Sequence, residues 1–130
     1  MLMLPLFVLL VLFAVDMALI GYQYVTASNA VREGARFASV NCGDGSCSVG
    51  DVETRTRDAS GGLLDAADPN TTLTVVWDDT ERGSAVMVRA EHEHSLLFFP
   101  IDFPVASCAV MRLEADDGGS GLPSGTADCS

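Results

Sequence analysis

The sequence predicts an α+β protein in which one long apolar helix carries a small antiparallel sheet, a short second helix and two disulfides. The chain opens on a long apolar run, helical spacing continues beyond that run, and the later part contains short stretches of alternating apolar residues. We expect residues 1–40 to form the long helix and residues 41–130 to form one head domain outside the membrane. About 90 residues suffice for a single small core.

The first half of the predicted helix is apolar throughout. Residues 2–20 contain a single charge, Asp16. Because a helix of about 20 apolar residues crosses the hydrocarbon core of a bilayer, residues 1–21 are expected to form a transmembrane and assembly segment. The alternative is a cleaved secretory signal, which has a basic start and a shorter apolar run. Pro5 falls in the first turn if the helix begins near Leu4, and would kink a helix that begins further upstream.

The second half, residues 22–40, is amphipathic. Small and apolar residues recur every three or four positions, and polar residues fall on another face at the same period. The apolar face comprises Tyr24, Ala27, Val31, Gly34, Ala35 and Ala38, and the polar face comprises Asn29, Arg32, Glu33 and Arg36. A lone glycine costs about 1 kcal/mol in a helix, so we expect the helix to continue through Gly21. The small residues would let a sheet pack closely.

The head begins with a glycine-rich loop at residues 41–50. A shorter helix is expected over residues 51–67, with Asp51 as its N-cap and Gly61-Gly62 weakening its end. Residues 68–70 form a turn.

Alternating apolar residues predict three strands, at residues 71–77, 84–91 and 105–113. Their inward faces comprise Leu73, Val75, Trp77, Val86, Val88, Ala90, Val105, Ala109, Met111 and Leu113. Between the last two strands, Pro100 and Pro104 interrupt an apolar stretch, which is expected to form a loop. That stretch comprises Phe98, Phe99, Ile101 and Phe103. Residues 115–130 form a Gly-, Ser- and Asp-rich tail that Cys129 would hold.

Charge and cysteine content restrict the function. The net charge is -11 and lysine is absent, which argues against nucleic-acid binding and against docking on anionic lipid head groups. Four cysteines in a small chain with an export-type start predict two disulfides and an oxidising compartment. Of the three possible pairings we expect Cys42–Cys47 and Cys108–Cys129, because each closes a short loop. The zinc alternative fits these spacings poorly.

Residues 5–40 carry a resemblance to a known family. Pro5 opens the apolar run, Asp16 stands late in it, and residues 30–38, AVREGARFA, match a block of the form A-x-R-E-G-A-R-x-A. These features resemble the TadE-like family of bacterial pilin-like proteins, in the tight-adherence (Tad) branch of type IV pili. Residues 109–114 also resemble the last strand of that family. The resemblance implies a pilin-like fold and a structural pilin or pseudopilin, not an enzyme, that supports adhesion or surface attachment.

The resemblance also implies a location and partners. Before assembly the chain would span the bacterial inner membrane with its head outside, and afterwards it would belong to an extracellular pilus filament. Its partners would be copies of itself or other pilins, together with the Tad secretion and assembly machinery. Pilins carry a leader that ends in glycine and a glutamate five residues after the cut. Residues 1–4 lack both, so we expect either an upstream start or a lost leader. The alternative function is a single-span, membrane-anchored binding module outside any filament.

The expected assembly surface is the apolar half of the helix. It comprises Leu6, Leu9, Leu10, Phe13, Asp16, Met17 and Ile20. A charge costs roughly 2.5–3.5 kcal/mol at the centre of a membrane helix, so Asp16 either pairs with a positive group of a neighbouring subunit or snorkels to the outer interface. The family block supplies candidate inter-subunit residues, which are Arg32, Glu33, Gly34 and Arg36. An intrahelical Glu33–Arg36 pair is the local alternative.

We predict no catalytic site, no metal site and no cofactor. No motif pairs a nucleophile with a base. His92 and His94 would share a strand face, but two ligands are too few for a metal site, so a solvated strand end is expected. Asp44, Asp51, Asp116 and Asp117 lack the spacing of a calcium loop. Residues 70–72, NTT, match a glycosylation sequon, a weak signal in a bacterial protein.

Overall fold

The computed structural model describes residues 3–42, 47–78, 82–96 and 102–114, with Gly125, Ala127 and Cys129. The described residues form a long apolar helix, a short helix and a three-stranded antiparallel sheet with two disulfides, so the α+β prediction is confirmed. Expectations for some positions lie outside the described residues. These positions are Asp44, Phe98, Phe99, Pro100, Ile101, Asp116 and Asp117.

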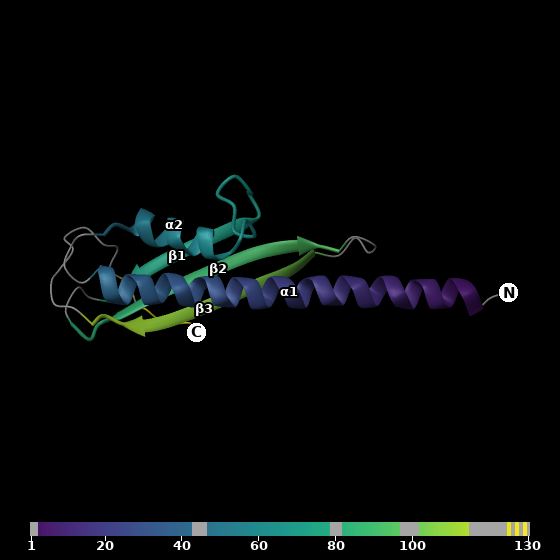
Figure 1. The fold of residues 1–130 in the computed structure, drawn as a ribbon, viewed down its shortest axis with the longest axis horizontal. Coiled ribbons are helices and arrows are strands. Elements are labelled where there is room, and N and C mark those ends of the chain that lie inside the picture. The colour runs from purple at the N-terminus through teal and green to yellow at the C-terminus, as the bar shows by residue number, and fades with distance from the viewer. Residues whose placement is uncertain are drawn as a thin grey trace.

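Helix α1 spans Met3–Asn41 and is one unbroken rod of 39 residues, about 58 Å long at 1.5 Å per residue. It runs through Gly21, where an added side chain would meet open space. Pro5 lies in the first turn, as expected. Figure 1 shows that the sheet and α2 lie along only the later part of α1, while the N-terminal part projects alone.

Helix α2 spans Val49–Ala59, so it begins and ends earlier than the predicted range. The predicted N-cap, Asp51, is wrong. Ser48 is the N-cap, and its hydroxyl accepts a hydrogen bond from the Asp51 N–H. The Ser48 N–H in turn donates to the Asp51 carboxylate at 2.7 Å, which completes a capping box. These bonds from the Ser48 N–H and hydroxyl hold the pKa of Asp51 below its ordinary value. The helix ends before Gly61, which adopts the left-handed conformation at φ +62°.

The sheet has the order β1-β2-β3 and is antiparallel throughout. Strand β1 spans Thr71–Trp77, β2 spans Ala85–Ser95 and β3 spans Asp102–Arg112. Strand β2 ends four residues later than predicted, and β3 begins three residues earlier. Phe103 and Pro104 therefore lie in β3 and not in a loop. Proline is tolerated there because β3 is an edge strand, where a missing N–H interrupts no second ladder.

The core lies between α1 and one face of the sheet, with α2 beside them (Figure 1). The predicted inward faces of the three strands contribute most of the sheet side, and Trp77 is its largest fully buried side chain. Helix α1 contributes small residues, namely Ala27, Ala30, Val31, Gly34, Ala35 and Ala38. Tyr24, predicted on this face, is exposed instead. It follows Gln23, which points at the sheet, and each helical residue turns about 100° from the last.

Two disulfides crosslink the head, one directly after α1 and one between β3 and the C-terminal tail. Cys42 pairs with Cys47 just after α1, with a Cα–Cα distance of 4.9 Å. Cys108 of β3 pairs with Cys129 of the tail at 5.9 Å. The tail makes a second contact where the Gly125 N–H donates to the Trp77 carbonyl at 2.8 Å. The C-terminal segment is thus tied to both edge strands of the sheet.

Candidate functional site

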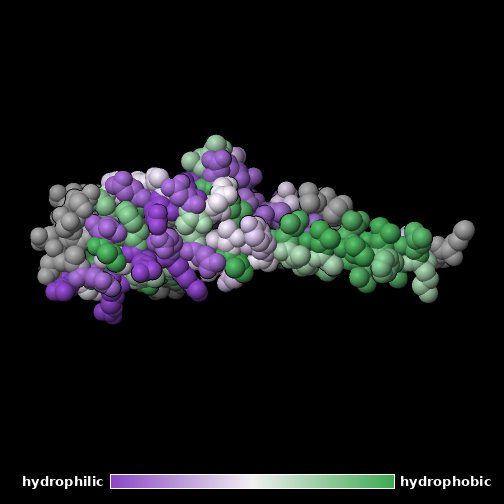
Figure 2. Space-filling view, viewed as in Figure 1, coloured by the Kyte–Doolittle hydropathy of each residue, from purple (hydrophilic) through white to green (hydrophobic). Residues whose placement is uncertain are grey.

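The N-terminal half of α1 exposes large apolar side chains. Figure 2 shows this half as a continuous hydrophobic surface beside a mostly hydrophilic head. α1 is long and apolar enough to cross a membrane, although no membrane is present in the structure. Most of the predicted assembly residues are exposed, namely Leu6, Leu9, Leu10, Phe13 and Met17, whereas Ile20 is half-buried.

Asp16 is buried, whereas its neighbours on α1 are exposed. Its side chain has 0% exposure, and neither carboxylate oxygen has a hydrogen-bond partner among the described residues. The snorkelling prediction is therefore wrong. The physical reason is its helical position, since Asp16 lies two turns before Gln23, on the face of α1 that packs against the sheet. Pairing of Asp16 with a neighbouring subunit stays a prediction.

The family block at residues 30–38 divides between two faces of α1. One face is buried and small, and Gly34 lies at its closest contact with α2. A Cβ added at Gly34 would lie 2.0 Å from Thr56 Oγ1, well inside any permitted contact. The Thr56 hydroxyl is itself buried and donates to the Val52 carbonyl at 2.7 Å. Gly34 thus allows α2 to pack directly on the α1 backbone.

The other face of the block is charged and exposed. Glu33 binds Arg55 of α2 at 2.9 Å, so its ion pair runs to the head and not to Arg36 as the local alternative predicted. Both partners are largely exposed, and such pairs contribute only about 0–1 kcal/mol. Arg32 and Arg36 are exposed one turn apart. Arg36 borders a shallow groove of about 210 Å³, lined by Glu33, Arg36, Phe37, Val40, Asn41 and Arg55.

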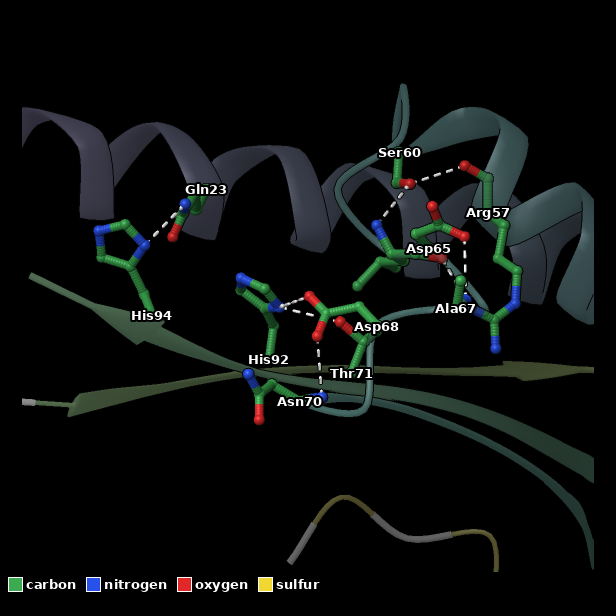
Figure 3. A network of polar contacts seen from close by, with 11 residues as sticks. Gln23, Arg57, Ser60, Asp65, Ala67, Asp68, Asn70, Thr71, His92 and His94 are labelled. Atoms are coloured by element: carbon green, nitrogen blue, oxygen red, sulfur yellow. Dashed lines mark hydrogen bonds and ion pairs between the residues drawn. The ribbon is translucent and has the colours of Figure 1, made fainter.

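Two histidines of β2 make polar contacts, one with α1 and one with the neighbouring strand β1 (Figure 3). Gln23 Nε2 lies 2.9 Å from His94 Nδ1, and Thr71 Oγ1 lies 2.9 Å from His92 Nδ1. His92 also lies 3.9 Å from an Asp68 oxygen. The solvated strand end predicted for the two histidines is wrong, because β2 continues to Ser95 and turns both toward α1.

Sequence reasoning did not find this histidine contact, although alternation from Ala90 through His92 to His94 was a signal for a longer strand. Among the described residues, no three His, Cys, Asp or Glu side chains are grouped to hold a metal ion. The candidate site in the described part of the molecule is the exposed apolar surface of α1.

These features define a class of protein: a small, disulfide-linked α+β head on a long helix whose first half is apolar and largely exposed. The family model described as TadE-like protein matches residues 1–36, which confirms the resemblance predicted from Pro5, Asp16 and the arginine block. The match covers most of α1 and stops before α2 and the sheet. No curated protein and no solved structure matches the chain. The family indicates a protein associated with the Tad pilus, and it is a structural family not known for enzymatic activity.

Proposed function

We propose that this chain is a structural pilin or pseudopilin subunit of a Tad-type pilus that assembles through α1 and supports adhesion or surface attachment. The supporting observation is the bare half of α1, where bulky apolar side chains are exposed from Met3 to Met17. In the inner membrane this surface would contact lipid. In a filament it would contact the same surface of neighbouring subunits, where close packing replaces lipid contacts.

Arg32 and Arg36 are the proposed polar contacts between subunits. The chain carries 18 acidic and only seven basic residues, so each exposed arginine is surrounded by potential partners on neighbouring heads. Neither arginine has an ion pair among the described residues, unlike Arg55 and Arg89. Charge complementarity of this kind fixes the register of an interface more than its affinity.

The test is a filament preparation that separates assembly from anchoring. Surface filaments are sheared from cells, viewed by negative-stain microscopy and analysed for this chain by mass spectrometry. We expect the wild-type chain in the filament fraction and the double variant Arg32→Ala/Arg36→Ala reduced there, with its membrane level unchanged. Arg112→Ala is the matched control, because Arg112 is an exposed arginine on the sheet.

Two other outcomes discriminate between hypotheses. A chain that stays in the membrane fraction and never enters filaments would support the alternative, a single-span binding module. For Asp16, assembly of Asp16→Ala at the wild-type level would exclude an essential pairing with a neighbouring subunit. Impaired assembly with a normal melting temperature would favour such a pairing.

A further inference from the structure

Arg32 and Arg36 form a basic stripe on the side of α1 that faces away from the sheet. Because each helical residue turns by about 100°, both arginines lie opposite the buried Ala27 and Ala38. Both are exposed, and Arg36 borders the shallow groove of about 210 Å³. This side of the molecule therefore suits an acidic surface on a partner.

Acidic side chains gather on the opposite side of the molecule, on the outer face of the sheet. Ala90 of β2 is buried in the core, so Glu91 and Glu93 lie on the outer face, where both are exposed. In the register of β2 with β3, the exposed Asp102 lies diagonally across from Glu93 on this face, about 7–8 Å away. Glu91 pairs with Arg89 at 2.6 Å. Glu93 and Asp102 have no ion pair within the part of the chain that the structure describes.

The two charged surfaces lie at different heights along α1. Gln23 contacts His94, so the neighbouring Glu93 lies level with Gln23. Arg36 follows Gln23 by 13 residues, which is about 20 Å along the helix. In two parallel copies of the chain, Arg36 of one therefore reaches Glu93 of the other only if the second copy is displaced by about 20 Å along α1.

We infer that Arg36 of one copy binds Glu93 and Asp102 on the outer sheet face of a second copy displaced in this way. This inference rests on the proposed pilin function and names the partner of that arginine. The occupant is a second copy because each chain carries both charged surfaces, on opposite sides. A contact between two different surfaces is heterologous, and with an axial displacement it repeats from copy to copy as an open helical filament.

The displacement distinguishes this contact from those that the membrane permits. The hydrocarbon core of a bilayer is about 30 Å thick, so two chains embedded at the same depth are not offset by about 20 Å. The contact therefore forms on assembly. Another exposed carboxylate, Glu114, lies near Arg36 in height, because its N–H donates to the Ser39 carbonyl of α1. A contact of Arg36 with Glu114 would join copies at one level, which does not extend a filament.

The absence of lysine permits a crosslink of defined origin. In Arg36→Lys the positive charge is kept, and the chain gains its only side-chain amine. A carbodiimide activates a carboxylate, which condenses with an amine in contact to form an amide without a spacer. Cells carry the full-length variant, and both sheared filaments and membranes are treated. Arg112→Lys is the matched control, because Arg112 is an exposed arginine at the far end of the outer sheet face.

In filaments of Arg36→Lys we expect a crosslinked dimer, in which mass spectrometry finds position 36 joined to Glu93 or Asp102. The dimer should be absent from membranes and from Arg112→Lys filaments. A charge exchange measures the strength of the contact. Arg36→Glu and Glu93→Arg should each reduce the filament-bound chain about fivefold, the upper value for one exposed ion pair, and the double variant Arg36→Glu/Glu93→Arg should recover it.

Each other outcome has a defined meaning. Filaments that contain the chain but give no such dimer, or join position 36 to Glu114, would overturn the inference and leave the proposed function intact. The same dimer in membranes would refute the displacement, and a double variant that does not recover would refute the pairing. A chain that is absent from filaments would overturn both the inference and the proposed function.

Discussion

Replacing Gly34 by alanine tests whether the family block serves to attach the head to α1. The new Cβ would lie 2.0 Å from Thr56 Oγ1 and 3.1 Å from Thr56 Cβ. Rotation of the Thr56 side chain would relieve only the first contact, and it would break the bond from this hydroxyl to the Val52 carbonyl. The second contact involves a Cβ fixed to the backbone, so α2 itself has to shift.

The magnitude follows from three opposing effects. Overpacking a tight contact costs about 1–3 kcal/mol, and loss of the buried hydrogen bond costs about 0.5–1.5 kcal/mol. Alanine regains about 1 kcal/mol of helix propensity over glycine. We therefore expect a net loss of about 2 kcal/mol, which lowers the melting temperature of a head of this size by roughly 8–16 °C.

The assay is thermal unfolding of the full chain in detergent, followed by circular dichroism. Gly50→Ala is the matched control, because Gly50 is helical and its added Cβ would meet only Ser48 Oγ at an ordinary 3.6 Å. The double variant Gly34→Ala/Thr56→Ala should lose less stability than the sum of the two single variants, since contacting sites couple by about 0.5–3 kcal/mol. A Gly34→Ala chain as stable as Gly50→Ala, with additive double-variant effects, would refute the reasoning.

Two further predictions concern the α2 cap and the disulfides. Ser48→Ala should lower stability by about 1 kcal/mol through loss of the N-cap. The pKa of Asp51 is depressed below its ordinary 3.8, so its contribution is full above that value and is lost as the pH falls through the lower, folded-state pKa. Melting temperatures measured from pH 5 to pH 2 should therefore fall less steeply in Asp51→Asn than in the wild type, and equal slopes would contradict this. Among the disulfides, Cys108→Ala/Cys129→Ala should cost more than Cys42→Ala/Cys47→Ala, about 3 against 2 kcal/mol, because the sequence separations are 21 and five residues. Urea unfolding would measure both, and a reversed order would show that packing of the buried Cys42 outweighs loop closure.

The elements predicted well were those with a strong period. Strand β1 was predicted at both ends and helix α1 to within two residues at each end, because apolar spacing continues along their whole length. The boundaries of β2 and β3 failed where polar residues or proline occupy inward or edge positions. His92 and His94 occupy inward positions of β2 with polar side chains, so hydrophobic alternation does not reveal them. Their contacts with Thr71 and Gln23 show which way they face.

The burial of Asp16 could not be predicted for a different reason. A sequence pattern places a residue on a helix face but does not state how far along the helix the head extends. The snorkelling prediction assumed that α1 is bare around Asp16, whereas the chain covers this side chain completely. Its two carboxylate oxygens find no hydrogen-bond partner in the described part of the chain, which makes this position costly, since a buried polar group without a partner loses its hydration.

Residues of the family block, 30–38, have different roles in the structure. Its small residues are buried between α1, α2 and the sheet, and Gly34 is required there whether or not the chain enters a filament. Glu33 is directed to Arg55 within the same head. Only Arg32 and Arg36 remain exposed for a partner. A defect in Gly34→Ala would therefore report on folding of the head, whereas a defect in the arginine variants with unchanged stability would report on assembly. The proposed function depends on the arginines and the bare half of α1, and the glycine cannot decide it.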